Sequence, residues 1–299
     1  MVSFALHHPA RLRRSVLSVP AINPRALQKI HDLDCDAVIF DLEDSVASDR
    51  KNEARDNLRR FFAETPLVGR ESIIRINALD TDFSAADLDT VLACAPDALL
   101  LPKVNEPEDV QIASDFLADS DAPDSLRIWA MMETPRSILN AAAIAEYGRT
   151  RDTRLDCFVI GLNDLRKDTG VPAEPGRTYL VPWLMQVLLA ARAYGLDVID
   201  SVSNDFKDLQ GLEAECRQGR AMGFDGKMLI HPAQIPAANR CFGPADEDLV
   251  EARAITAAFA DPAAASLNVI NSNGRMIERL HLEQAERLLQ KAALIENRE

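Results

Sequence analysis

The chain has 299 residues, of which 47% are hydrophobic and 27% charged, a composition typical of a soluble globular protein with a large core. Its 33 basic and 47 acidic residues give a net charge of −14, which argues against nucleic acid and anionic membranes as partners, although a local Arg or Lys cluster could still bind a small anion. No apolar stretch approaches the roughly 18 residues of a membrane span, and the basic stretch Met1–Arg14 lacks the apolar core of a signal peptide.

Short apolar runs, many of them β-branched, predict eight strands along the first three quarters of the chain. They are Ser15–Val19, Ala37–Leu42, Ser72–Ile76, Ala98–Leu101, Arg127–Met132, Asp156–Ile160, Asp197–Ile199 and Gly226–Ile230. Amphipathic stretches between them, several of which begin with Pro or an Asp or Ser cap, predict helices. These are Pro24–Leu33, Asp49–Phe62, Ala85–Cys94, Pro107–Leu117, Pro135–Tyr147, Pro182–Tyr194 and Asp208–Met222. Strands that are apolar on both faces indicate a parallel sheet covered by helices, and eight of them predict a (β/α)8 TIM barrel, with a doubly wound open sheet as the alternative.

The pattern changes after Pro244, so we expect a barrel domain over residues 1–244 and a C-terminal helical extension over residues 245–299. Two long helices are predicted, Asp246–Phe259 and Met276–Ile295, joined by an Ala/Ser/Asn-rich link. A barrel needs one closing helix, so the second is surplus. It either caps the barrel bottom or crosses to a neighbouring subunit.

Several familiar kinds of site are absent from the sequence. Five cysteines without a CxxC spacing indicate reduced thiols and a cytoplasmic protein, and the five histidines form no i, i+4 pair of the kind that binds zinc. The chain lacks GxGxxG, P-loop and GxSxG motifs, which argues against a dinucleotide enzyme, an NTPase and an α/β-hydrolase.

Two acidic residues that follow apolar runs are the strongest indication of chemistry. Glu133 follows Ile128–Met132, and Asp164 lies shortly after Cys157–Ile160. If these runs are neighbouring parallel strands, about 4.8 Å apart, one divalent cation can bridge both carboxylates. Two carboxylates with the remaining positions left to water or substrate suit Mg²⁺. Alternatively, Asp164 simply caps a helix.

Polar groups also follow the other predicted strands, at the end where barrel active sites form. They are Asn23, Glu43 with Asp44, Asn77, Lys103, Asn163, Asp200 and His231. Each alone could be a helix cap or a solvated loop residue. It is their coincidence at all eight strand ends that favours a site.

The cations at these ends suit an anionic substrate. Arg75 alternates with Ile74 and Ile76 and offers a fork of donors for a carboxylate or an oxyanion, with Glu133 or Asp164 as expected acidic partners. A purely structural ion-pair layer is the alternative, and Lys103 has a weaker claim to the same role. Lys51 and Arg55, one helical turn apart, either bind an anionic cofactor tail or lie on a solvated helix face.

An ordered series of motifs resembles the citrate lyase β-subunit superfamily, the citryl-CoA and malyl-CoA lyases with their malyl-CoA thioesterase relatives. The motifs are Arg14–Leu17 with Val19-Pro20, Phe40–Val46, Lys51 with Ala54-Arg55, Arg75–Asn77, Leu101–Val104, Met132–Thr134, and Gly223–Lys227 with Ile230–Gln234. They span nearly the whole chain.

This resemblance implies a barrel that assembles as trimers or trimer-based hexamers, with Mg²⁺ (or Mn²⁺) on Glu133 and Asp164. It implies an acyl-CoA substrate, CoA contacts from Asn23, Lys51 and Arg55, and Arg75 acting near the reacting carbonyl. It also implies that a carboxylate from the segment Gly274–Glu278 reaches the active site of an adjacent subunit. That carboxylate is Glu278 here.

Three departures from the family pattern bear on the reaction. Ala21 replaces a usual Gly, and Glu278 replaces the Asp that is usual in the lyases, which shifts the carboxylate by more than about 1 Å. The third departure is that Thr134-Pro135-Arg136 follows Glu133 and Leu162-Asn163 follows Gly161. Features shared with the thioesterase branch include the run from Trp129 to Met132. Against that branch, Ser201 and Ser203 stand where it tends to carry Gly and Tyr.

The expected reaction is Mg²⁺-dependent cleavage of a short 3-hydroxy dicarboxylic acyl-CoA to an oxo acid and an acyl-CoA. Arg75 would stabilise the enolate and Glu278 would move the proton. Lys103 and the backbone at Gly161, Leu162 and Asn163 would bind substrate, the latter at a helix N-terminus. Hydrolysis of the thioester, with Glu278 or Glu43 as base, is the first alternative, and a non-catalytic subunit of a lyase complex is the second.

Overall fold

The computed structural model describes residues 11–150, 153–260, 267–272 and 275–298. The chain divides into two compact units, one running from Arg13 to Phe242 and one within Gly243–Glu299. The boundary between the units lies after Phe242, where α9 ends, and the sequence led us to expect it after Pro244.

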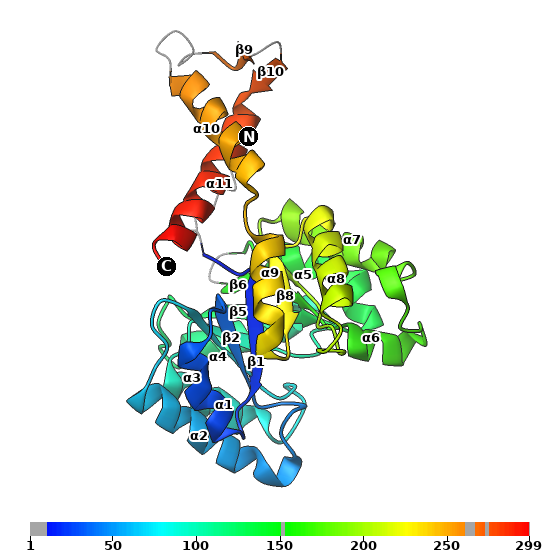
Figure 1. The fold of residues 1–299 in the computed structure, drawn as a ribbon. Coiled ribbons are helices and arrows are strands. Elements are labelled where there is room, and N and C mark those ends of the chain that lie inside the picture. The colour runs from blue at the N-terminus through cyan, green and yellow to red at the C-terminus, as the bar shows by residue number, and fades with distance from the viewer. Residues whose placement is uncertain (1–10, 151–152, 261–266, 273–274, 299) are drawn as a thin grey trace. The chain divides into compact units, whose positions relative to one another are not determined.

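Eight parallel strands form a closed barrel in chain order (Figure 1). They are β1 (Ser15–Pro20), β2 (Ala37–Asp41), β3 (Glu71–Arg75), β4 (Ala98–Leu101), β5 (Arg127–Met132), β6 (Leu155–Ile160), β7 (Asp197–Asp200) and β8 (Gly226–Leu229). Because β1 pairs with both β2 and β8, the sheet has no open edge. The predicted (β/α)8 barrel is confirmed, and the open-sheet alternative is excluded.

Helices connect the strands and pack outside them. Their bounds are α1 (Pro24–Lys29), α2 (Lys51–Glu64), α3 (Ser84–Cys94), α4 (Pro107–Asp119), α5 (Pro135–Tyr147), α6 (Leu162–Thr169), α7 (Val181–Ala193), α8 (Leu209–Met222) and α9 (Ile235–Phe242). Proline in the first turn and a cap before it begin α4 and α5, as the sequence predicts. Two helices of eight residues each, α6 and α9, are not among the predicted ranges, although a helix N-terminus after Gly161 was expected.

The barrel has an apolar interior and a separate apolar layer between strands and helices. Ile39, Ile73 and Met131 belong to the interior cluster, whereas Phe40, Ile74 and Met132 belong to the outer layer. Side chains alternate along a strand, so the residue two positions after an interior residue again points inward. This alternation directs Asp41, Arg75 and Glu133 to the inside of the barrel, at the ends of their strands.

The second unit contains α10 (Asp246–Ala260), β9 (Val269–Ser272), β10 (Arg275–Glu278) and α11 (Arg279–Glu296). The predicted helix Met276–Ile295 is wrong at its start. Residues 276–278 are instead a strand that pairs antiparallel with β9, a strand inside the predicted link. The helix begins only after Glu278, whose φ of −106° and ψ of 166° are extended. Of the rest of that link, residues 261–266 and Asn273 lie outside the described residues.

None of the helices in the described parts of the chain is long and apolar enough to cross a membrane.

Candidate active site

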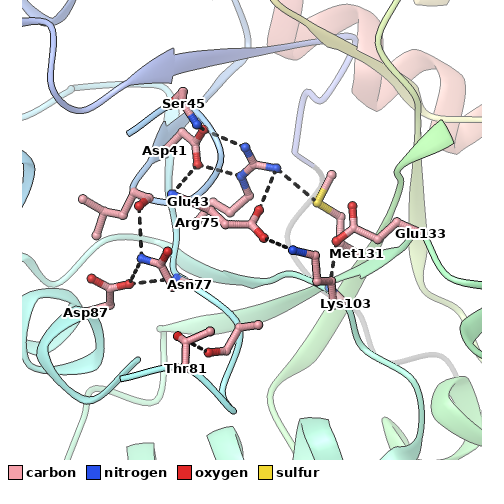
Figure 2. A network of polar contacts seen from close by, with 12 residues as sticks. Asp41, Glu43, Ser45, Arg75, Asn77, Thr81, Asp87, Lys103, Met131 and Glu133 are labelled. Atoms are coloured by element: carbon pink, nitrogen blue, oxygen red, sulfur yellow. Dashed lines mark hydrogen bonds and ion pairs between the residues drawn. The ribbon is translucent and has the colours of Figure 1, made fainter. Parts of the chain in front are cut away.

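Arg75 is the centre of a buried ionic network at the end of β3 (Figure 2). Its Nε and Nη2 donate to the two carboxylate oxygens of Asp41 at 2.7 and 2.6 Å, and its Nη1 lies 3.1 Å from Glu43 Oε2. Burial alone would lower the pKa of Arg75, but the charge and hydrogen bonds of Asp41, followed by the charge of Glu43, raise it above its usual value. The guanidinium is therefore a permanent, rigidly held cation.

The partners of Arg75 differ from those expected. Asp41 and Glu43 hold it, whereas Glu133 acts on it only through its charge. Asp41 was not singled out in the sequence, although a signal for it exists. That signal is its place two residues after the interior residue Ile39; the structure adds that it is the register partner of Arg75 in the neighbouring strand.

Glu43 and Lys103 extend this network towards solvent. Lys103 Nζ donates to Glu43 Oε1 at 3.0 Å, and the Lys103 side chain is 43% exposed whereas that of Glu43 is 6% exposed. Burial raises the pKa of Glu43 although Arg75 opposes this effect. Glu43 Oε2 has no hydrogen bond of its own in the described structure, despite the nearby guanidinium. A buried carboxylate that has a raised pKa and one oxygen without a hydrogen bond is able to exchange a proton.

Glu133 follows β5 and is 1% exposed. Its Oε1 accepts from the main-chain N–H of Lys103 at 2.8 Å, and Lys103 adopts a left-handed φ of 52°. Backbone strain of this kind is typical of positions that a site holds in place. A Cβ on Gly161 would lie 2.5 Å from both Cβ and Oε2 of Glu133, so only glycine fits after β6.

The charge on Glu133 is costly where it lies. Burial, followed by the negative charge of Glu43 and assisted by that of Asp164, raises the pKa of Glu133 to about 8, although the Lys103 amide and Arg75 oppose this. Asp164 lies in the first turn of α6 and is partly exposed. Glu43 and Asp164 thus both place negative charge near Glu133 at this end of the barrel, and this combined charge is suited to a divalent cation.

The available ligands suit magnesium better than a metal whose ligands are all protein side chains. Among the described residues, no three His, Cys, Asp or Glu side chains cluster in a way that could hold an ion. Mg²⁺ is usually bound by one or two carboxylates, with water and substrate at the remaining positions. Glu133 and Asp164 supply that number of carboxylates.

The N-terminus of α6 contains the predicted substrate-binding backbone. Gly161 is the N-cap and has no capping side chain. The N–H of Leu162 donates to Ser201 Oγ at 3.1 Å, and Asn163 and Asn204 exchange two side-chain hydrogen bonds of 2.8 and 3.2 Å. Binding of a substrate carboxylate by these groups stays a prediction, and the Leu162 amide already has a protein acceptor.

The three residues predicted to contact CoA, Asn23, Lys51 and Arg55, each make hydrogen bonds or ion pairs within the protein. Lys51 is buried and its Nζ donates to the carbonyls of Leu42 and Glu43, each at 2.7 Å. Arg55 is buried against Asp87, at 2.7 Å. The solvated-face alternative for this pair is therefore wrong, and a direct contact with CoA stays a prediction. Asn23 is exposed and caps α1 through the Ala26 amide at 3.2 Å.

Asp200 and His231, which also follow strands, make contacts outside the network around Arg75. Asp200 faces the helix layer and binds Arg177 Nη1 at 2.7 and 2.9 Å. His231 accepts from the Ala233 amide and stacks on Phe206, with ring centroids 4.7 Å apart. Glu278 belongs to the second unit, where it is the N-cap of α11.

The barrel is that of a known class of proteins. The family model described as HpcH/HpaI aldolase/citrate lyase matches residues 14–232, and the chain belongs to this family. It is 42% identical over 288 residues to a (3S)-malyl-CoA thioesterase of Cereibacter sphaeroides, with 96% of this chain and 97% of that protein covered. It is 31% identical to the human mitochondrial citramalyl-CoA lyase, with 99% and 90% covered.

A solved structure has the same fold. A crystal structure of the protein CitE from Mycobacterium tuberculosis, in complex with magnesium, acetoacetate and coenzyme A, matches with a TM-score of 0.73 and 31% identity, covering 93% of this chain and 97% of that one. The family resemblance expected from the ordered motifs is confirmed.

Proposed function

We propose that this protein is a Mg²⁺-dependent carbon–carbon lyase that cleaves a short 3-hydroxy dicarboxylic acyl-CoA, of the malyl-CoA or citryl-CoA type, to an oxo acid and an acyl-CoA. The observation that carries the proposal is the buried Glu133 carboxylate, which lies in the negative field of Glu43 and, to a smaller extent, of Asp164, and near the fixed Arg75 cation. Relatives named as CoA lyases and a CoA thioesterase support the substrate class.

Glu133 and Asp164 are the residues that would hold Mg²⁺, and Mn²⁺ suits the same oxygen donors. A bound cation of this kind supplies Lewis-acid polarisation of the substrate oxygens. The magnesium in the CitE complex supports the choice of metal.

Arg75 stabilises negative charge on the thioester. Cleavage removes the hydroxyl proton, turns the hydroxyl-bearing carbon into a carbonyl and leaves the electron pair of the broken bond as an enolate on the thioester, which then takes up a proton. Asp41 orients the guanidinium through two hydrogen bonds, so no reorganisation is needed as the enolate oxygen gains charge. Glu278 of a neighbouring subunit accepts the hydroxyl proton and returns it to the enolate carbon in this proposal.

Thioester hydrolysis is the second candidate, and the 42% identity to a malyl-CoA thioesterase favours it. Water would add to the thioester carbonyl, Arg75 would stabilise the resulting oxyanion, and CoA would leave as the thiolate. Glu43, whose pKa is raised by burial, or Glu278 would accept the proton of the water.

Product analysis separates these functions. The purified protein is incubated with Mg²⁺ and malyl-CoA, citryl-CoA or methylmalyl-CoA, and oxo acid and free thiol are followed separately. A lyase releases an oxo acid without free thiol, and a thioesterase releases CoA thiol while the hydroxy acid stays intact. No turnover of any of the three would contradict both and favour a non-catalytic subunit.

The assembly and location are part of the same proposal. We infer a homotrimer, or a hexamer built from trimers, in which Glu278 completes a neighbouring site and Asn23, Lys51 and Arg55 lie on the side from which CoA enters. The five cysteines, all in the described part of the chain, are thiols and not disulfides, which supports a cytoplasmic location.

A further inference from the structure

The first turn of α6 carries Asp164 but cannot cap itself. The N-cap is Gly161, and a side chain there would collide with Glu133 at 2.5 Å. The usual capping residues Ser, Thr, Asp and Asn are thereby excluded. The first amides of a helix have no acceptor within the helix, so they need one from elsewhere.

Ser201 supplies that acceptor from another strand. It follows β7 directly, is 0% exposed, and its Oγ accepts from the Leu162 N–H at 3.1 Å. Leu162 is the first residue of α6, and Asp164 comes two residues later in the same turn. The Ser201 hydroxyl thus fixes the backbone from which the Asp164 side chain extends.

Ser201 is itself held by a buried ion pair. Its N–H donates to Asp200 Oδ1 at 2.8 Å, and Asp200 is bound by Arg177, with both side chains at most 1% exposed. A main-chain N–H bound to a buried, hydrogen-bonded pair has little freedom to move, so the Ser201 backbone is held in place. The arrangement runs from Arg177 through Asp200 and Ser201 to the α6 N-terminus.

We propose that Ser201 is a positioning residue of the active site, which holds the first turn of α6 so that the Asp164 carboxylate meets that of Glu133 around one cation. The inference rests on the proposed function, because it takes Asp164 as a metal ligand. Groups that orient metal-binding residues without touching the ion commonly change metal affinity when they are replaced.

The test measures metal binding directly, without turnover. Mn²⁺ is titrated into the full-length protein and free Mn²⁺ is followed by electron paramagnetic resonance. Ser201→Ala removes the acceptor, and we expect it to weaken Mn²⁺ binding by about tenfold, the lower end of the range for residues behind a metal ligand. Asp164→Asn should weaken it at least as much. Ser203→Ala is the matched control, because Ser203 contributes its main-chain carbonyl to Gln234, and it should bind Mn²⁺ like the wild type.

The outcomes separate this inference from the proposed function. If the wild type does not bind Mn²⁺, or if Asp164→Asn binds it unchanged, the metal site itself is contradicted. If Asp164→Asn loses affinity but Ser201→Ala does not, Ser201 does not position the site. Circular dichroism and thermal unfolding without metal show whether each variant is folded.

A measurement on the wild type keeps the inference testable if Ser201→Ala does not fold. Hydrogen exchange at the Leu162 amide should be slow, because a buried hydroxyl accepts from it, although amides at the first position of a helix ordinarily lack a partner. Fast exchange at Leu162 would overturn the inference.

Discussion

Glu133 illustrates how the fold places an acid where its charge is unfavourable. The side chain is 1% exposed and lies near Glu43 and Asp164, yet it receives a hydrogen bond from the strained Lys103 backbone. Such a residue costs stability unless a cation is bound, and this combination of burial and a strongly shifted pKa is typical of functional sites.

The raised pKa of Glu133 predicts the pH dependence of stability in metal-free protein. The folded-state pKa of about 8 lies above the ordinary value of 4.5, so the native state binds this proton more tightly than the unfolded state. The stabilisation from Glu133 is complete below about pH 4.5 and is lost as the pH rises through about 8. Glu133→Gln should flatten this part of the profile, as measured by urea unfolding in a chelator, while Glu108→Gln on the exposed face of α4 should leave it unchanged. An identical slope in Glu133→Gln and wild type would contradict the burial argument.

The same substitution tests the role of Glu133 in catalysis. A glutamine keeps the size of the side chain but removes its charge, so Glu133→Gln should reduce turnover to background while the protein stays folded. Assays at saturating Mg²⁺ check this expectation. Full turnover in the variant would rule out the metal assignment.

The backbone at Gly161 lies so close to the Glu133 side chain that the addition of a single methyl group should disturb the site. The new Cβ in Gly161→Ala would lie 2.5 Å from Glu133 Cβ and Oε2, so the Glu133 side chain must shift. A displacement of about 1 Å in a catalytic group can cost about 10²-fold in rate, and we expect kcat/KM to fall by about that factor. A variant with wild-type kcat/KM would mean that the Glu133 position is not critical.

At the scale of elements, α2 supports the loop that carries Glu43. Lys51 Nζ donates to the carbonyls of Leu42 and Glu43, and Arg55 pairs with Asp87, whose carboxylate also accepts from the Asn77 amide at 2.8 Å. One helix face thus holds the ends of β2 and β3. Lys51 and Arg55 therefore stabilise the loops that carry the site residues, whether or not they also contact CoA.

Lys51→Met separates the two roles of that residue. The variant keeps the apolar stem but leaves two buried carbonyls without their donor, which costs about 1–3 kcal/mol of unfolding free energy, and it should lower kcat because Glu43 loses its support. If Lys51 instead binds CoA, KM for the acyl-CoA should rise while stability changes little. Lys29→Met, on the exposed part of α1, is the control. Denaturant unfolding and steady-state kinetics decide between these outcomes.

The strands and most helices were predictable because their causes are local. Runs buried on both faces identified every barrel strand to within about one residue at either end. The start of α11 was not predicted correctly, because residues 276–278 become a strand only through their pairing with Val269–Ser272, which lies inside the segment predicted to be a link.

The site was predictable in part for the same reason. Alternation placed Arg75 inside the barrel, but its partner Asp41 depends on the register between β2 and β3, which a single sequence does not display. The inward orientation of Lys51 and Arg55 depends likewise on contacts with distant loops, and locally both look like ordinary surface residues of a helix.

At the scale of the whole molecule, the second unit carries Glu278, the carboxylate proposed to act in a neighbouring subunit. Its Glu278 begins α11 after the β9–β10 hairpin, and the family resemblance assigns this carboxylate to a neighbouring site. Glu133→Gln and Glu278→Gln are each expected to be inactive alone.

Co-expression of these two variants distinguishes action within a subunit from action between subunits. With equal, random mixing in a symmetric ring, a site built from two subunits has an intact Glu133 in one half of cases and an intact Glu278 in one half, so about a quarter of the sites are complete. The mixed oligomers should therefore recover about a quarter of wild-type activity. Absence of any recovery would mean that both residues act in the same subunit.

The most direct test of the central claim is the location of a bound ion. Crystals grown with Mn²⁺ and measured at the manganese absorption edge should give one anomalous peak at the barrel mouth, within about 2.2 Å of a carboxylate oxygen from Glu133 and of one from Asp164. A peak that contacts only one of these residues, or no peak at the barrel mouth, would contradict the claim that they share a single metal ion.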